Sequence, residues 1–196
     1  MGADCIGADR IASPTEDVSR RTLIAGAVGV ALPIASPALL VPSPAQARGI
    51  AQAVQPDDER FMRMAIAEAA RGDYPFGSVI VRDGKVMVKG RNLVKQEKNP
   101  TAHGEMVAIR RFLARYGPDT LKGTTLYTSG ESCVMCMGAI LWCGISRLVY
   151  GASLAELAAK IGQIMVTDAE IADRTPFAEI AITGGVLAAE SLALFK

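Results

Sequence analysis

Net charge is what this sequence lacks most plainly. It holds 21 Lys and Arg residues against 20 Asp and Glu residues, a formal charge of +1 at pH 7. Residues 1–47 contain three basic and four acidic side chains, which leaves 18 basic and 16 acidic ones in residues 48–196. Because a nucleic-acid-binding surface usually carries a concentrated basic excess, this balance argues against a nucleic-acid partner.

Cysteine and histidine are scarce as well. Four cysteines in 196 residues are too few for a disulfide-stapled scaffold, and His103 is the only histidine. Internal repeats are absent from the sequence, and its one biased tract is Ala- and Pro-rich and precedes residue 48. Half of the residues are hydrophobic, so the chain can bury a sizeable core, and its length suits one domain plus an extra segment.

The extra segment has the features of an export signal. Arg20 and Arg21 precede a weakly apolar, Ala- and Gly-rich run from Leu23 to Val41, and a Pro-rich stretch then ends in Ala-Gln-Ala at 45–47. A charged start, an apolar middle and a small-x-small cleavage site are the parts of such a signal. The Ser-Arg-Arg-x-Leu order resembles a twin-arginine signal. We therefore divide the chain into a removable signal, 1–47, and a mature domain, 48–196.

A retained membrane anchor is the alternative for this segment, because its apolar run is just long enough to span a bilayer. Pro33 and Pro37 lie inside the run and would kink or break such a helix, which favours a cleaved signal. Cys5 lies upstream of the arginines and would leave with the signal. We expect a bacterial periplasmic protein that the twin-arginine translocation machinery exports.

Helix and strand patterns alternate along residues 48–196. Asp83-Gly84 separates two β-branched runs, which is a strong hairpin signal. The predicted helices are 57–72, 103–117, 133–143, 154–162 and 184–195, and the predicted strands are the two runs within 76–92, then 124–129 and 146–153. This alternation predicts an α/β fold in which helices cover both faces of a sheet.

Four residues at the starts of two predicted helices can carry chemistry. Cys133 and Cys136 are one helical turn apart, so both sulfurs can reach one ion, and a helix start favours the thiolate form. His103 supplies a third ligand, and a Cys/Cys/His set leaves the fourth tetrahedral position open, as in a catalytic zinc site. Glu105, two residues beyond His103, is placed to accept a proton from the water that the metal activates.

Other roles for the two cysteines remain open on spacing alone. Cys-x-x-Cys is also found in redox dithiols and in structural zinc sites. A redox role would require a thioredoxin-like fold around the motif, for which the sequence gives little support. A structural zinc site would require a fourth ligand, and Cys143 is the only other cysteine of the mature chain. Packing in the core explains Cys143 better than metal binding does.

Together these motifs resemble a known family. "HGE" at 103–105 and "ESCVMC" at 131–136 are similar to the His-x-Glu and Pro-Cys-x-x-Cys signature of zinc-dependent nucleobase and nucleoside deaminases, the cytidine deaminase-like superfamily. The likeness runs from about residue 57 to 196. "YPFGSVIV" (74–81), "NPTAHGEM" (99–106) and "GAILWCGISRLVYG" (138–151) look most like bacterial guanine deaminases.

The resemblance has two local departures. Ser132 stands where the family usually has proline, and a serine there can serve as a helix N-cap. Gly104 stands where the family usually has alanine, which costs on the order of 1 kcal/mol inside a helix. The segment after Tyr150 also differs from guanine deaminases, and that part helps to read the base in the family.

The resemblance implies a fold, a cofactor and partners. It implies a three-layer α/β/α sandwich with a mixed sheet of about five strands, one Zn²⁺ per chain and a homodimer. It also implies hydrolytic deamination of a small aminated heterocycle, with a purine base such as guanine favoured, and release of ammonia. By the same resemblance, Phe76 stacks on the base, Asn92 hydrogen-bonds to its edge and Trp142 helps to wall the pocket. The alternatives are an RNA-directed adenosine deaminase and a catalytically idle zinc-binding or redox protein.

Overall fold

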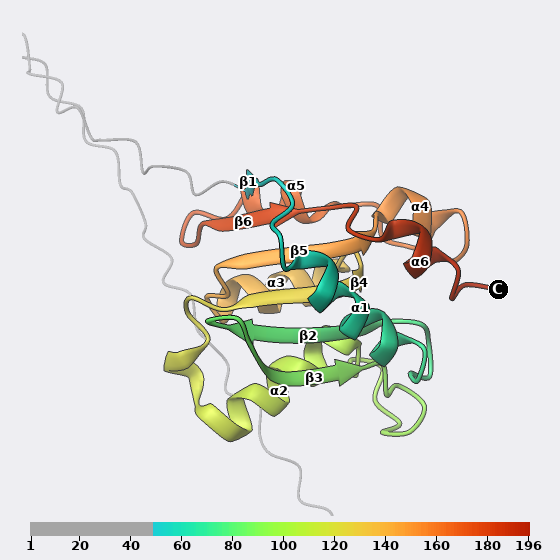
Figure 1. Cartoon of the computed structure of the whole chain (residues 1–196), viewed down its shortest axis with the longest axis horizontal. Coiled ribbons are helices and arrows are strands. Elements are labelled where there is room, and N and C mark those ends of the chain that lie inside the picture. Colours follow the sequence, from blue (N-terminus) through green and yellow to red (C-terminus); the bar gives the residue numbers. More distant parts are fainter. Residues whose placement is uncertain (1–48) are drawn as a thin grey trace, which may run out of the picture. The chain divides into compact units, whose positions relative to one another are not determined.

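The computed structural model of the chain describes residues 49–196, in which one mixed six-stranded sheet lies between layers of helices (Figure 1). The strands are in the order β1-β6-β5-β4-β2-β3. Their bounds are Gly49–Ala51 (β1), Gly77–Arg82 (β2), Lys85–Arg91 (β3), Thr125–Gly130 (β4), Arg147–Ala152 (β5) and Ile180–Thr183 (β6). β1, β6, β5 and β4 are parallel, and β2 is antiparallel to both β4 and β3.

Helices cover both faces of this sheet. Their bounds are Asp58–Ala69 (α1), Gly104–Tyr116 (α2), Val134–Trp142 (α3), Leu154–Ala158 (α4), Asp168–Asp173 (α5) and Ala188–Leu192 (α6), with a short 3-10 helix at Pro118–Thr120 (η1). α1 and α6 pack on one face, and α2, α3 and α5 pack on the other (Figure 1). The predicted α/β class with helices on both faces is therefore confirmed.

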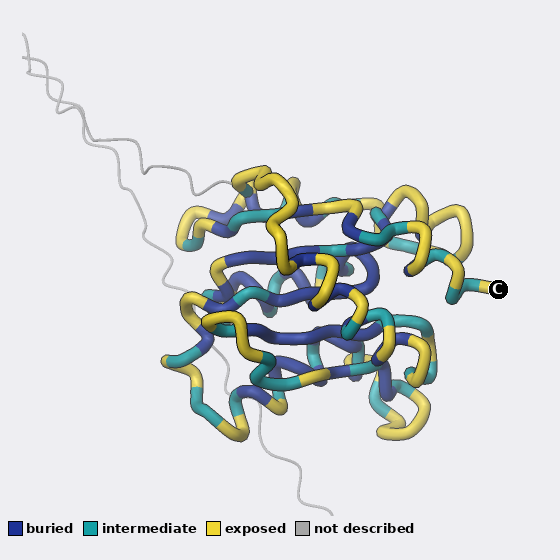
Figure 2. The backbone as a smooth tube through the Cα atoms, in the orientation of Figure 1, coloured by how far each residue is buried: buried dark blue, intermediate teal, exposed yellow. Residues whose placement is uncertain are grey.

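Alternation along the strands explains the two cores. Val79 and Val81 in β2 and Tyr127 in β4 point toward α1, whereas Ile80 and Leu126 point toward α2 and α3. Successive side chains of a strand point to opposite faces, so each central strand fills both cores. The central strands are accordingly the most buried part of the chain, and the exposed segments lie in the outer connections (Figure 2).

Two strands and one helix were not foreseen. β1 has three residues without apolar alternation, β6 has four residues, and α5 has six, so each is too short for a clear periodic signal. β1 and β6 pair in parallel although they lie far apart in sequence. Added to the four strands predicted by range, they give a sheet of six strands, where the family resemblance implied about five. The predicted helices 154–162 and 184–195 are also shorter than expected, at Leu154–Ala158 and Ala188–Leu192.

A buried ion pair ties α1 to the sheet. Arg147 in β5 donates two hydrogen bonds to Asp58 at the start of α1, from Nη1 to Oδ1 at 2.7 Å and from Nη2 to Oδ2 at 2.8 Å. The Tyr127 hydroxyl donates to the same carboxylate, and Arg147 also donates to Thr183 in β6. Asp58, the first residue of α1, therefore anchors the start of this helix to β5.

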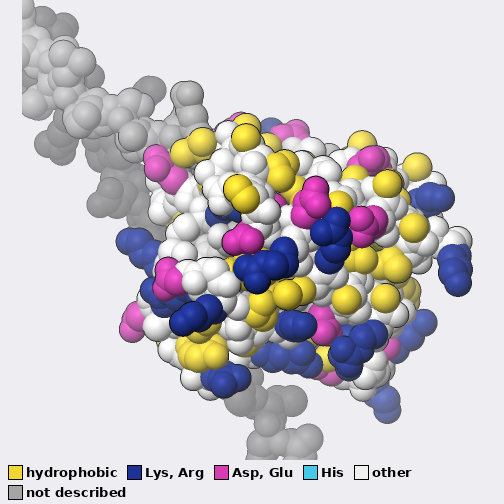
Figure 3. All heavy atoms as spheres, in the orientation of Figure 1, with side chains coloured by type: hydrophobic (Ala, Val, Ile, Leu, Met, Phe, Trp, Pro, Cys, Tyr) yellow, Lys and Arg dark blue, Asp and Glu magenta, His cyan; other side chains and the backbone are white. Residues whose placement is uncertain are grey.

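The predicted export signal, residues 1–47, lies outside the described residues. Within residues 49–196, no helix combines the length and the apolar character that crossing a membrane requires. On the face of the molecule shown in Figure 3, acidic side chains lie among the basic ones, consistent with the near-neutral charge of the chain.

Candidate active site and metal centre

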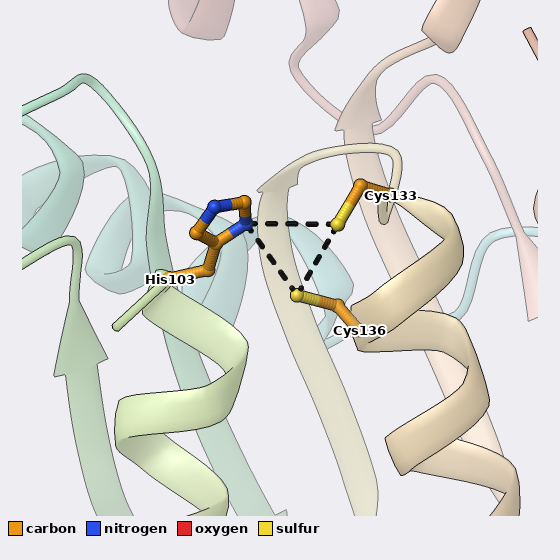
Figure 4. A group of neighbouring side chains, drawn as sticks. All are labelled: His103, Cys133 and Cys136. Carbon is orange, nitrogen blue, oxygen red and sulfur yellow. Dashed lines mark hydrogen bonds between the residues drawn. The ribbon is translucent and has the colours of Figure 1, made fainter. Parts of the chain in front are cut away.

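The residues of the two motifs meet at one end of the sheet, where two helices begin. His103 is the N-cap residue of α2 and Cys133 is the N-cap residue of α3, both with extended backbone. β4 ends at Gly130 and leads through two residues into Cys133, so the strand positions the start of α3. The first turn of α3 then brings Cys136 to the same side as Cys133 (Figure 4).

The three ligand atoms form a nearly equilateral triangle. His103 Nδ1 lies 3.6 Å from Cys133 Sγ and 3.7 Å from Cys136 Sγ, and the two sulfurs are 3.6 Å apart (Figure 4). Zinc–sulfur bonds of about 2.3 Å and zinc–nitrogen bonds of about 2.0–2.1 Å at tetrahedral angles require separations of about 3.5–3.8 Å. The triangle therefore fits a tetrahedral zinc ion with one position left for another ligand.

The pKa values of the two thiols are shifted in opposite directions. A hydrogen bond from Cys136, with help from His103 and against the cost of burial, lowers the pKa of the Cys133 thiol to about 4. The same hydrogen bond and burial raise the pKa of the Cys136 thiol, because a second thiolate beside the first is unfavourable. Binding of a divalent cation by both sulfurs as thiolates releases their protons.

Glu105 is the second residue of α2 and lines the same cavity as His103 and Cys133, with 3% of its surface exposed. Burial is the largest influence on this carboxyl and raises its pKa, although backbone hydrogen bonding at the helix start opposes the shift. A buried carboxyl beside a metal centre, with a pKa above its ordinary value, is suited to accept and return protons near neutral pH.

A cavity of about 280 Å³ opens next to the triangle. His103, Glu105 and Cys133 form its metal-proximal wall. The other lining residues come from four separate segments: Tyr74, Phe76, Asn92, Val94, Pro100, Glu131, Ile161, Gly162 and Gln163. Its size is near the lower end of the range of about 300–1,000 Å³ that small-molecule sites occupy, so it suits a single small ring system.

Comparison with known proteins agrees with this arrangement. The model of the cytidine and deoxycytidylate deaminase zinc-binding region matches residues 55–152, which is half of the chain. The chain belongs to this family. The guanine deaminase of Bacillus subtilis is 39% identical over 105 residues, covering 51% of this chain and 67% of that enzyme. A tRNA-specific adenosine deaminase of Haemophilus influenzae is 37% identical over 138 residues, covering 68% of this chain and 78% of that enzyme.

Solved structures give the same result for the fold. A guanine deaminase from Nitrosomonas europaea aligns with a TM-score of 0.56 at 26% identity, covering 87% of this chain and 97% of the other. The coverage of other relatives is smaller. The chain spans 8% of the chloroplastic tRNA(adenine(34)) deaminase of Arabidopsis thaliana and 65% of the tRNA-specific adenosine deaminase of Aquifex aeolicus.

Membership of this deaminase family identifies the metal centre. His103, Cys133 and Cys136 form the zinc site of a deaminase-family enzyme, and the predicted cofactor is thereby confirmed. The donor set is the expected one, since thiolate and imidazole are the ligands that zinc prefers.

Asn92 and Phe76, the predicted base contacts, both line the deaminase cavity. Asn92 Oδ1 accepts the backbone N–H of Val94 at 3.2 Å, which orients the amide so that its Nδ2 is the donor left for a ligand. The Phe76 ring packs edge-to-face against Phe195, with ring centroids 5.3 Å apart. Asn92 and Phe76 both line the cavity, and each is fixed by a contact with a neighbouring residue, Val94 or Phe195.

Trp142 is a different case, because it does not line this cavity and its predicted base contact stays a prediction. It is the last residue of α3, with 78% of its surface exposed, and it stacks on Phe177 at a centroid distance of 4.4 Å. The nine residues of α3 rise about 12 Å along the helix axis from Val134 to Trp142, which carries the indole away from the zinc ligands. It borders a separate surface depression with Lys122 and Glu179.

The two departures from the family pattern have structural explanations. Ser132 does not cap α3, because Cys133 is the N-cap residue and the Ser132 hydroxyl has no hydrogen-bond partner among the described residues. At Gly104, an added Cβ would lie 3.0 Å from the carbonyl oxygen of Phe76. Glycine therefore matches the close approach of α2 to the segment that carries Phe76.

Sequence reasoning missed Glu131 and the segment 159–166, which joins α4 to α5. Glu131 lines the cavity, and Ile161, Gly162 and Gln163 form the cavity wall contributed by this segment. An acidic residue directly before the cysteine motif is a signal that could have drawn attention to Glu131. Segment 159–166 has no comparable signal, because its place over the cavity depends on how α4 and α5 pack.

Proposed function

We propose that this enzyme deaminates a free purine base, with guanine favoured, by replacing the exocyclic amine with oxygen from water and releasing ammonia. The observation that carries the proposal is the cavity itself. It places a zinc site, a buried carboxyl, an amide donor and an aromatic ring around a space that suits one small ring system. The guanine deaminases among its relatives support the choice of base.

Each side chain has a role that follows from its position. Zinc held by His103, Cys133 and Cys136 would supply Lewis-acid activation of the attacking water. Glu105 would accept one proton of that water and deliver it to a ring nitrogen of the base. It would then carry the second proton from the new hydroxyl to the amine, which leaves as ammonia when its C–N bond breaks. Asn92 Nδ2 donates to an acceptor on the edge of the base, and Phe76 stacks on its face. General acid–base help of this kind is worth about 10²–10⁴ in rate.

A second candidate is deamination of adenosine in tRNA. Its support is the similar identity to tRNA-specific adenosine deaminases, at 37% for the relatives from Haemophilus influenzae and Aquifex aeolicus. The near-neutral charge of the chain favours the free base, because RNA binding relies on a concentrated positive surface.

Substrate choice is tested by a direct comparison of rates. The zinc-loaded full chain is assayed for ammonia release from guanine, adenine, cytosine and their nucleosides, and for inosine formation in a tRNA anticodon stem-loop. The proposal expects the highest kcat/KM with guanine, and a rate with the stem-loop that is lower by at least a factor of about 100. A faster reaction with the stem-loop would establish the second candidate instead.

Export and assembly are further proposals. Residues 1–47 are proposed to direct folded, zinc-loaded protein through the twin-arginine pathway, which would protect the Cys133 and Cys136 thiols from oxidation outside the cytoplasm. Amino-terminal sequencing of the protein from a periplasmic fraction tests this, and a mature start near Arg48 is expected. A homodimer is proposed from the family resemblance, and light scattering of the purified protein tests it.

A further inference from the structure

The turn that carries the first zinc ligand is tied to α5 by a buried hydrogen bond. Ser132, directly before Cys133, donates its backbone N–H to Asp168 Oδ2 at 3.1 Å. Asp168 is the first residue of α5, and both residues are almost fully buried, at 0% and 1% exposure. This bond therefore joins the zinc-binding turn to the helix that follows segment 159–166.

The side chain of Glu131 makes a second connection between the end of β4 and the helices α4 and α5. Glu131 Oε1 accepts the backbone N–H of Asp168 at 3.1 Å, and its Oε2 accepts the backbone N–H of Leu154, the first residue of α4, at 2.6 Å. Asp168 thus accepts a hydrogen bond from the Ser132 backbone with its side chain and donates one to the Glu131 side chain with its backbone. The two helices on either side of segment 159–166 are held against the end of β4 by the same pair of carboxylates.

The main chain of Ser132, and not its hydroxyl, makes this connection. Ser132 Oγ and Asp168 Oδ1 are buried and have no hydrogen-bond partner among residues 49–196. Where the family usually has proline at position 132, no N–H exists to donate. Serine at this position therefore supplies a donor that proline lacks, and the carboxylate of Asp168 uses it.

We propose that Asp168 is a positioning residue for the zinc site, acting through the Ser132 N–H to hold the Cys133 turn in the geometry that zinc requires. In this role, Asp168 acts through the Ser132 backbone and does not bind the zinc ion itself. Groups that orient metal ligands from outside typically contribute 10–100-fold to metal affinity. The inference rests on the zinc site and not on the choice of substrate.

Two substitutions of Asp168 test the proposal in the full chain. Zinc affinity is measured by competition with a chromophoric chelator, and ligand geometry by the visible spectrum of the Co²⁺-substituted protein. Asp168→Ala removes the acceptor, and we expect at least about tenfold weaker zinc binding and an altered Co²⁺ spectrum. Asp168→Asn keeps an acceptor oxygen for the Ser132 N–H, and we expect affinity within about threefold of the natural chain and an unchanged spectrum.

Substitutions of Ser132 test the same bond from its other side. Ser132→Pro removes the N–H and should weaken zinc binding as Asp168→Ala does, whereas Ser132→Ala keeps the N–H and should leave affinity and spectrum unchanged. Because both changes break one bond, the double variant Ser132→Pro/Asp168→Ala should bind zinc no more weakly than either single variant. Effects that multiply in the double variant would overturn the proposal.

Folding is followed in parallel by circular dichroism, with zinc and after chelation. If Asp168→Ala does not fold, Ser132→Pro decides the question with the same readouts. Unchanged zinc affinity and Co²⁺ spectrum in a folded Asp168→Ala or Ser132→Pro variant would overturn the proposal. Loss of folding in both variants would also overturn it, since the bond would then be needed for the fold and not for the zinc site.

Discussion

At the residue scale, the helix starts of α2 and α3 decide what the site can do. His103 and Cys133 are N-cap residues, so their side chains project from helix ends whose unpaired N–H groups favour a negative partner. Glu105 and Cys136 follow within one turn and complete a zinc site with a buried proton carrier beside it. One turn of each helix thus carries most of the proposed chemistry.

Asn92 gives a prediction at this scale. Asn92→Asp keeps the oxygen that accepts the Val94 N–H but replaces the Nδ2 donor with an oxygen that repels an acceptor on the base. We expect kcat/KM for guanine to fall by at least about 100-fold, because an unpaired polar group at a base edge is costly, while the melting temperature changes little. Steady-state kinetics and thermal unfolding check both parts. A normal kcat/KM in this variant would remove Asn92 from the site.

At the element scale, most of the site could be predicted from the sequence. The His-x-Glu and Cys-x-x-Cys spacings fixed four residues, and the Asp83-Gly84 hairpin is confirmed, with positive φ at both residues as a tight turn requires. The position of Trp142 outside this cavity could not be predicted, because a helix of apolar residues does not reveal which end faces a cavity. Segment 159–166 was missed because its position depends on contacts with residues distant in sequence.

Glu131 gives the prediction at the element scale. Its carboxylate accepts two buried N–H groups, so Glu131→Gln must turn an NH₂ toward one of them. We expect a loss of about 1–3 kcal/mol of unfolding free energy and a raised KM, because the ends of segment 159–166 shift. The matched control is Glu156→Gln, which alters an exposed capping box of α4 and should cost about 1 kcal/mol or less without a change in KM. Chemical denaturation and kinetics measure both variants.

At the scale of the whole molecule, long-range contacts join parts that the sequence cannot pair. β1 pairs with β6, and Arg147 links α1, β5 and β6 through Asp58 and Thr183. Alternation and turn signals predicted the α/β class, since these are local patterns. The β1–β6 pairing and the ion pair depend on residues about 90 or more positions apart, for which a single sequence carries no local signal.

Asp58 gives the prediction at this scale. Asp58→Ala leaves the Arg147 guanidinium buried without its partner, and breaking such a pair costs about 3–5 kcal/mol of unfolding free energy. The control is Glu59→Ala, which breaks an exposed pair with Arg63 and should cost about 1 kcal/mol or less. Urea denaturation of both variants gives the comparison. Equal losses in the two variants would contradict the role assigned to the buried pair.

The most direct test of the account is ammonia release from guanine by the zinc-loaded full chain and by its Glu105→Gln variant, with bound zinc measured in both. Glu105 is not one of the three residues of the zinc site, so the variant should keep one zinc ion per chain. We predict steady release by the natural chain and a loss of at least about 100-fold in the variant. Equal rates in the two proteins, or silence of the natural chain with every base tested, would contradict a zinc-dependent deaminase that works through Glu105.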